Sequence, residues 1–178
     1  MITKKKTQFI FLFHGGLQGI RKPIEATLRA FKRVKNPDIR LIIKSQAVHR
    51  RSEQVVVDDD PRISHVVADM DAEEYRKLCT SCHVCLAPAR WEGLGVHLYE
   101  SLGFGIPVIS NNIPPINEVI THNQSGLLTK NIFLKEKGNG LKIYDPDEND
   151  LQRCIERLTN QDVLSEMTES TKEAAKKF

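Results

Sequence analysis

The chain has 178 residues; 40% are hydrophobic, 28% are charged, and the formal net charge is +3. That length is enough for one domain with a sizeable core, and the composition is ordinary for a globular protein. The charge is too small and too dispersed to indicate nucleic-acid binding, no apolar run could span a bilayer, and the N-terminus lacks the pattern of a signal peptide.

The first third of the chain predicts two strands around one helix. Residues 9–14 are a short apolar run that we interpret as a buried strand, followed by a glycine-bearing loop at 15–20. Pro23 is well placed to start a helix. The apolar face of that helix is marked at spacings of three and four by Ile24, Leu28, Phe31 and Val34. Residues 39–44 are a second strand, and the polar stretch 45–60 is expected to be a solvated loop.

The middle of the chain continues this alternation. We predict strands at 62–68, 83–87 and 107–110. Asp71 and Glu74 have the spacing of a capping box, which predicts a helix over 72–82. A second helix, of two to three turns, is expected between the glycines that follow Pro88 and the strand at 107–110.

The last third predicts a strand at 123–128 and helices at 148–158 and 162–176. Between them, residues 131–140 are rich in lysine and glycine and are expected to form either a hairpin or a mobile loop. The regular alternation of strands and helices predicts an α/β fold, with a Rossmann-like parallel sheet covered by helices on both faces. We expect residues 1–8 to be a disordered or tag-like segment and residues 9–178 to be one domain.

The four cysteines are expected to be buried free thiols in a reducing cytoplasm. Cys79, Cys82 and Cys85 have the C-x2-C-x2-C spacing of some metal sites. However, the first ends a predicted helix and the last lies in a predicted strand, which should point the thiols apart. No nearby fourth ligand completes an iron–sulfur motif, so we predict no metal site.

The chain is organised around residues 89–109, where a loop with two glycines joins a buried strand to a helix. Gly93 and Gly95 allow a ligand to approach the backbone closely, and the free N–H groups of the first helical turn favour an anion. Glu92 and Glu100 bracket this site. Were both helical, they would lie about 12 Å apart along the axis. An extended ligand with hydroxyl groups could contact both.

This stretch resembles the signature of the retaining glycosyltransferases of family 4 ("group 1"), which have the GT-B fold. The resemblance rests on two glutamates with seven residues between them, followed by the run Gly105-Ile106-Pro107-Val108-Ile109. Ser101 stands where alanine is usual and Leu94 where phenylalanine is usual, and both changes are mild. The likeness covers the chain from about Phe9 to Phe178.

The resemblance implies a C-terminal, donor-binding half that transfers a hexose from a nucleotide-diphosphate sugar, such as a UDP- or GDP-sugar, to an acceptor hydroxyl with retention. It implies no metal and no cofactor. The partner it implies is an N-terminal acceptor-binding domain, which this chain lacks, so the chain alone is expected to be inactive. It also implies that the protein acts in the cytoplasm, in polysaccharide or glycoconjugate biosynthesis. Any peripheral membrane association would concern the full-length enzyme only.

The resemblance also implies roles for individual residues. Lys22 and Arg21 would bind the diphosphate, Glu92 the sugar hydroxyls and Glu100 the ribose. The segment Val67-Ala68-Asp69 would lie near the base. The full set implied to bind the donor is Gly15, Gly16, Arg21, Lys22, Val67, Glu92, Gly93, Leu94, Gly95, Val96 and Glu100. Of these, Glu92 and Lys22 are expected to be catalytic. Gly16 replaces an arginine that is usual in the family, which predicts the loss of one phosphate contact unless Arg21 supplies the charge.

Two other functions are considered. The chain could be a nucleotide-binding or regulatory module without activity. A Rossmann oxidoreductase is disfavoured, because the glycines at 15, 16 and 19 lack the G-x-G-x-x-G spacing and no acidic residue ends the second strand. His97 is equally compatible with a structural and a functional role. His14 lies near the glycine-bearing loop at 15–20, where the resemblance implies phosphate binding. Trp91 could line the site or cover the core, and we favour the second interpretation.

Overall fold

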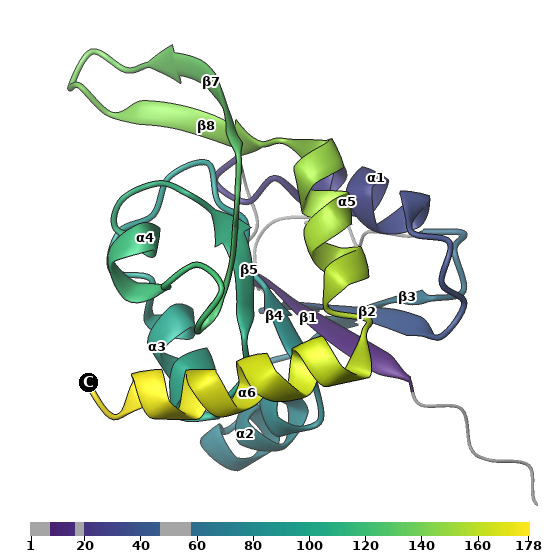
Figure 1. Ribbon diagram of the computed structural model, residues 1–178. Coiled ribbons are helices and arrows are strands. Elements are labelled where there is room, and N and C mark those ends of the chain that lie inside the picture. Colours follow the sequence, from purple (N-terminus) through teal and green to yellow (C-terminus); the bar gives the residue numbers. More distant parts are fainter. Residues whose placement is uncertain (1–7, 17–19, 47–57) are drawn as a thin grey trace, which may run out of the picture.

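The computed structural model describes residues 8–16, 20–46 and 58–178. Its main feature is a six-stranded sheet in the order β3-β2-β1-β4-β5-β6, in which all neighbours are parallel (Figure 1). The strands are β1 (Phe9–Gly16), β2 (Ile39–Ser45), β3 (Ile63–Val67), β4 (Val84–Leu86), β5 (Val108–Asn111) and β6 (Gly126–Thr129). From β1 the chain builds outwards to β3 on one side and, after returning to β4, outwards to β6 on the other.

Helices cover both faces of this sheet. They are α1 (Ile24–Arg33), α2 (Ala72–Thr80), α3 (Val96–Gly103), α4 (Ile116–Val119), α5 (Glu148–Arg157) and α6 (Gln161–Ala175). Side chains of α1 and α5 belong to one apolar cluster and those of α2, α3 and α4 to another. The long helix α6 crosses the end of the sheet where β4 and β5 begin (Figure 1). The predicted Rossmann-like fold with helices on both faces is therefore confirmed.

The two clusters follow from the alternation of side chains along each strand. In β1, Phe9, Phe11 and Phe13 pack into the cluster that contains α1 and α5, whereas Leu12 packs into the cluster on the opposite face. Because both faces are covered, nearly every side chain of this central strand is apolar. The first polar side chain is that of His14, near the carboxyl end of the strand.

The predicted element boundaries are correct to within a few residues. The capping box is present: the Glu74 N–H donates to Asp71 Oδ1 at 2.8 Å, and the Asp71 N–H donates to Glu74 Oε2 at 3.1 Å. The helix it starts ends at Thr80, two residues before the predicted end. The strand predicted at 123–128 begins only at Gly126, because Asn123 has a positive φ of 64° and begins a turn.

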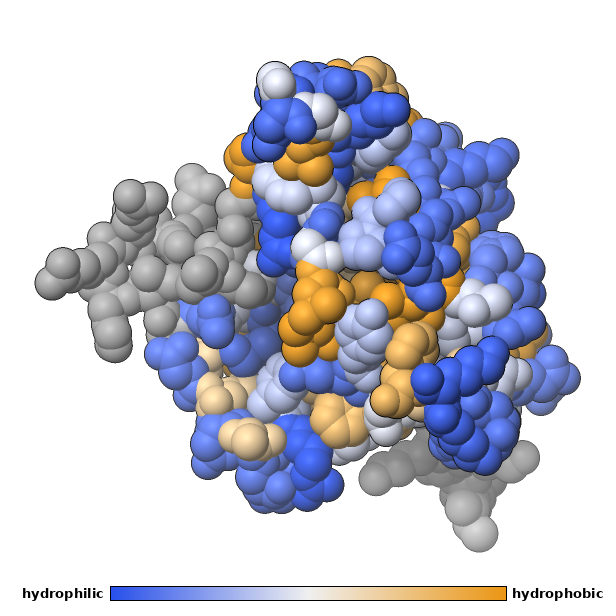
Figure 2. Space-filling view, turned by 90° about the vertical axis from the view of Figure 1, so that its left-hand side faces the viewer, coloured by the Kyte–Doolittle hydropathy of each residue, from blue (hydrophilic) through white to orange (hydrophobic). Residues whose placement is uncertain are grey.

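The lysine- and glycine-rich residues 131–140 belong to a hairpin. Of the two structures expected for them, a hairpin or a mobile loop, the first is therefore correct. Strands β7 (Asn131–Glu136) and β8 (Lys142–Pro146) pair antiparallel and project from the body of the domain (Figure 1). Figure 2 views the molecule from the hairpin side and shows the largely hydrophilic tip above a face on which hydrophobic side chains gather. The ring of Phe133 meets that of Tyr144 edge-on at 5.6 Å, which braces the two strands.

Cys79, Cys82, Cys85 and Cys154 are buried free thiols, as predicted. The three that are close in sequence pack into the same apolar cluster. Burial raises the pKa of Cys82 to about 11 and that of Cys85 to about 12. These thiols are therefore protonated and unreactive at neutral pH.

Several sequence predictions fall outside the described ranges. They concern residues 1–7 of the segment expected to be disordered or tag-like, residues 17–19 of the glycine-bearing loop, and residues 47–57 of the expected solvated loop. Within the described ranges, none of the helices has the length and apolar character that crossing a membrane requires.

Candidate functional site

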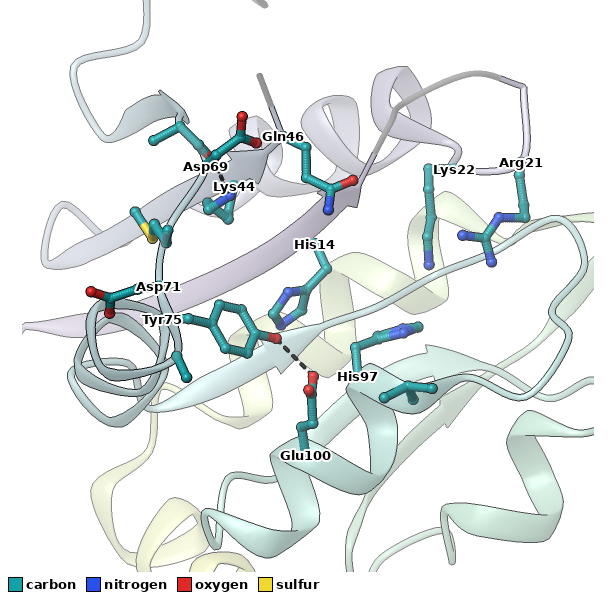
Figure 3. Close-up of a pocket in the computed structure, with 14 residues that line it drawn as sticks. His14, Arg21, Lys22, Lys44, Gln46, Asp69, Asp71, Tyr75, His97 and Glu100 are labelled. Carbon is teal, nitrogen blue, oxygen red and sulfur yellow. Dashed lines mark hydrogen bonds between the residues drawn. The ribbon is translucent and has the colours of Figure 1, made fainter. Parts of the chain in front are cut away.

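A cavity of about 580 Å³ lies at the carboxyl ends of β1, β2 and β3 (Figure 3). Its walls come from the ends of these strands, the segment before α1, and the first turns of α2 and α3. β1 lies between β2 and β4, and the chain continues from these two strands toward opposite sides of the sheet. A crevice therefore remains at the carboxyl end of β1. In open α/β sheets this position is the usual place for a ligand.

One end of the cavity carries two cations that share a single carboxylate. Lys22 Nζ lies 3.2 Å from Glu92 Oε2, and Arg21 Nη1 forms an ion pair with Glu92 Oε1. The side chains of Lys22 and Glu92 are each only 4% exposed. Burial lowers the pKa of Lys22, and the charge of Glu92 opposes that shift. Two positive charges against one negative charge leave this end electropositive, which favours an anionic ligand.

Glu92 therefore lies beside the cavity, bound to the cations that line it. Its position is maintained by backbone as well as by charge, because the N–H of Gly93 donates to Glu92 Oε1 at 3.0 Å. The preceding loop is clamped by buried Asn111, whose side chain accepts from the N–H of Ala89 at 2.8 Å and donates to its carbonyl oxygen at 2.7 Å. The carboxylate is thus held by a loop with little freedom to move.

The start of α3 faces the same cavity. Gly95 is the N-cap with φ of 68°, and a Cβ at this position would lie 2.9 Å from Leu98 Cδ1, so a larger residue is excluded. No side chain caps α3, and its first turn carries no acidic residue. The first N–H groups of a helix have no partner within it, and the helix dipole makes this end positive. With Val96 in the lining, the helix start adds to the positive end of the cavity.

The middle of the cavity contains a tyrosine–glutamate pair that brings α2 and α3 together. The hydroxyl of Tyr75 donates to Glu100 Oε2 at 2.8 Å (Figure 3). Desolvation raises the pKa of Tyr75, and the hydrogen bond to Glu100 adds to that shift. Glu100 therefore has the partner that a carboxylate in an apolar helix requires. Its other oxygen remains suited to accept from a ligand hydroxyl.

Lys44 closes the far end, near β3. Its Nζ donates to the carbonyl oxygens of Ser45 at 3.0 Å and Ala68 at 2.7 Å, and burial lowers its pKa. The lining continues with Ala68 and Asp69, whereas Val67 is 43% exposed and does not line the cavity. Of the three residues expected near the base, Ala68 and Asp69 therefore line the cavity and Val67 does not.

Two histidines lie between the cationic end and Glu100. The rings of His14 and His97 are 5.5 Å apart, and both line the cavity (Figure 3). Burial, with the nearby charge of Lys22, lowers the pKa of His14 to about 4 and that of His97 to about 2. Both are neutral at pH 7. The Nε2 atom of His97 is shielded from solvent and forms no hydrogen bond with any residue that the structure describes.

The structure brings only part of the predicted set into the lining, namely Arg21, Lys22, Val96 and Glu100. Glu92 lies behind the cations, and Gly93, Leu94 and Gly95 form the loop that leads into α3. Gly15 and Gly16 end β1, and a Cβ on Gly15 would lie 2.6 Å from Ser45 Oγ, so Gly15 permits close packing against β2.

Tyr75 and Lys44 are among the lining residues that sequence reasoning missed. A polar residue that ends a buried strand was a usable signal for Lys44, whereas Tyr75 lies on the helix predicted at 72–82 without any motif. Trp91 is half-buried and does not line the cavity, and Lys137 Nζ of the hairpin lies 4.6 Å from its ring centre. In residues 8–16, 20–46 and 58–178, no three His, Cys, Asp or Glu side chains are grouped to hold a metal ion.

A sequence model of the family described as "Glycosyl transferases group 1" matches residues 2–178 of the chain. Among curated proteins, an uncharacterized 41.2 kDa protein in the cps region of Klebsiella pneumoniae is 42% identical over 45 residues. That alignment covers 25% of this chain and 13% of the Klebsiella protein.

Solved structures show the same fold. Anabaena HepE, determined with UDP and glucose, has a TM-score of 0.73 and 14% identity over 96% of this chain and 44% of its own. Sucrose-phosphate synthase from Thermosynechococcus elongatus has a TM-score of 0.71 and 19% identity over 96% of this chain and 41% of its own. The C-terminal domain of the group 1 protein LpcC from Francisella tularensis has a TM-score of 0.73 and 13% identity, covering 96% and 87%. The chain thus spans less than half of HepE and of the synthase.

Proposed function

Since this chain belongs to the group 1 glycosyl transferases, we propose that it is the C-terminal, donor-binding half of a retaining hexosyltransferase of family 4. The substrate would be a nucleotide-diphosphate sugar, and the hexose would pass to an acceptor hydroxyl. The observation that carries the proposal is the order of groups along one cavity: two cations and a helix start at one end, and a glutamate held by Tyr75 further in. That order suits a diphosphate followed by a ribose.

Different parts of the cavity would bind different parts of this ligand. Arg21, Lys22 and the uncapped start of α3 would bind the diphosphate by charge and by N–H groups. Glu100 would accept hydrogen bonds from the ribose hydroxyls, and the backbone at Ala68 and Asp69 would adjoin the base. HepE was crystallised in complex with UDP, which makes a uridine nucleotide the first ligand to test on this chain.

In the reaction that we propose, the bond between the anomeric carbon and the diphosphate oxygen breaks, and its electron pair leaves with the diphosphate. Lys22 and Arg21 would stabilise this developing negative charge. The acceptor oxygen would bond to the same face of the sugar, with its proton passing to the departing phosphate. Glu92 would orient both cations and contact the sugar hydroxyls when the donor is bound. The proposal needs neither a metal nor a cofactor.

The rest of the enzyme is part of the proposal. The acceptor would be bound by an N-terminal domain, as the coverage of HepE and of the synthase suggests, because this chain spans less than half of each. Peripheral membrane association would concern the full-length enzyme only. Four buried free thiols favour a reducing compartment, for which we propose the cytoplasm.

Calorimetric titration of the chain with UDP, GDP and their hexose conjugates tests the proposal, with NAD as the control for a dinucleotide site. We expect one nucleotide series to bind and the affinity to fall in Glu100→Ala. Binding of NAD in preference to every nucleotide sugar would contradict the proposal. Binding of a nucleotide by the chain, together with failure of the chain joined to its N-terminal domain to transfer sugar, would favour a non-catalytic nucleotide-binding module.

A further inference from the structure

Arg90 joins three segments that are distant in the chain. Its N–H donates to the carbonyl oxygen of Arg21 at 2.8 Å, and its Nη1 donates to the carbonyl oxygen of Ile20 at 2.8 Å. Its Nε donates to Asp145 Oδ1 at 2.7 Å, and its own carbonyl oxygen accepts from the N–H of Tyr144 at 3.0 Å. The last two partners belong to β8. One residue therefore ties the hairpin to the segment that precedes α1.

The ion pair between Arg90 and Asp145 is partly buried. The side chains of Arg90 and Asp145 are only 27% and 24% exposed, so solvent screens their attraction less than it screens a fully exposed pair. Three of the four bonds involve a backbone group, which fixes where the main chain runs. A second contact lies nearby, because Lys137 of the hairpin turn is stacked on the ring of Trp91.

The segment held by Arg90 is the one that positions the cations. Arg21 and Lys22 come directly after Ile20, and both side chains point into the cavity (Figure 3). Their common partner, Glu92, lies two residues after Arg90. Arg90 therefore sets the separation between the backbone that carries the cations and the backbone that carries their carboxylate.

We propose that Arg90 is a positioning residue for donor binding, and that the β7–β8 hairpin braces it. Through its bonds to the main chain at 20–21, Arg90 holds Arg21 and Lys22 where a diphosphate can meet both. The inference rests on the proposed function, since it assigns the two cations to the diphosphate. It extends that function by making the inserted hairpin part of the structure on which donor affinity depends.

Titration of the full chain with UDP and with UMP tests this role through Arg90→Met, which keeps an unbranched apolar stem but removes the guanidinium. Arg62→Met is the matched control. Arg62 also binds a carboxylate, that of Asp60 at 2.7 Å, and a backbone carbonyl, that of Val34 at 2.6 Å, but it lies outside the cavity lining. Arg90→Met removes the two guanidinium bonds, to Asp145 and to the carbonyl oxygen of Ile20, and we expect the resulting displacement of the cations to weaken UDP binding about tenfold.

The ratio of UDP to UMP affinity separates positioning from general loosening of the fold. We expect Arg90→Met to reduce this ratio, because the second phosphate depends on the placement of the cations, and Arg62→Met to leave it unchanged. An unchanged ratio in Arg90→Met, or an equal reduction in both variants, would overturn the inference.

If the wild-type chain binds no nucleotide, that result would count against the proposed function alone. The inference about Arg90 can then still be tested by a thermal double-mutant cycle. If Arg90 positions the ion cluster, the melting-temperature losses of Arg90→Met and Glu92→Gln should not add, whereas those of Arg62→Met and Glu92→Gln should. Additive losses in both pairs would reject a positioning role for Arg90.

Discussion

Replacing Glu92 by glutamine removes the one negative charge that Arg21 and Lys22 share, with almost no change in shape. Glu92 and Lys22 are each 4% exposed, so their charges are poorly screened. Breaking a buried ion pair by removing one partner costs about 3–5 kcal/mol, because the remaining charge stays desolvated. Glutamine can still accept the N–H of Gly93, and the Arg21 side chain is 41% exposed and can turn to solvent. We therefore expect the lower end, about 3 kcal/mol.

Urea and thermal unfolding of the wild type and of Glu92→Gln measure this loss. For a domain of this size, each kcal/mol shifts the melting temperature by about 2–4 °C, so we expect a drop of roughly 6–12 °C. Glu148→Gln is the matched control. Glu148 also bridges two cations, Arg29 at 2.8 Å and Arg33 at 2.9 Å, but these are 54% and 44% exposed. Its replacement should cost less than about 1 kcal/mol.

The two glutamates can be compared because each bridges two basic side chains, whereas the pairs of Glu92 are more buried than those of Glu148. Equal losses in the two variants would refute the argument that burial controls the energy of the Glu92 cluster. A gain of stability in Glu92→Gln would refute it more directly. It would mean that the desolvation cost of the glutamate exceeds its attraction to both cations.

Other predictions concern ligand binding and pH. Lys22→Ala and Glu100→Ala should each weaken nucleotide-sugar binding in calorimetry while circular dichroism shows an intact fold; unchanged affinity in both would remove the site assignment. Tyr75→Phe should lower stability in urea unfolding by about 1 kcal/mol, because one buried hydrogen bond is lost. Since the pKa of His14 is lowered to about 4 and that of His97 to about 2, the unfolded chain binds their protons first on acidification. The stability that these neutral histidines contribute is fully present above the ordinary histidine pKa of about 6.5. Below it, the free energy of unfolding decreases, by about 2 kcal/mol for each residue near pH 5. Urea unfolding should show a smaller loss between pH 7.5 and pH 5 in His97→Gln, and an identical loss would contradict the assigned burial effect.

The sheet and its helices were predictable because their signals are local. The continuous apolar run of β1 and the capping box at Asp71 each involve residues that are close together in the chain. The site was predictable only where a motif exists, as at Glu92 and Glu100. The pairing of Glu92 with Arg21 and Lys22 joins positions about 70 residues apart, and no pattern within either segment contains it.

The same limit explains the errors. The hairpin could not be distinguished from a mobile loop, because lysine and glycine are compatible with both and the pairing of Phe133 with Tyr144 is a tertiary contact. The contact of Trp91 with Lys137 could not be predicted either, because it joins the loop before α3 to that hairpin. Val67 lies outside the lining although Ala68 and Asp69 belong to it, because which residue at a strand end faces a cavity depends on tertiary packing.

The uncapped start of α3 bears on how this domain could be made more thermostable. The helices α2, α5 and α6 each begin with a side-chain cap, from Asp71, Asp147 and Asn160, whereas α3 begins at Gly95 without one. A capping aspartate or serine is ordinarily a safe way to gain about 1 kcal/mol. At Gly95 it would strain a left-handed backbone and occupy N–H groups that face the cavity. Selection for heat resistance alone would therefore be expected to avoid this position, and consensus engineering should leave it unchanged.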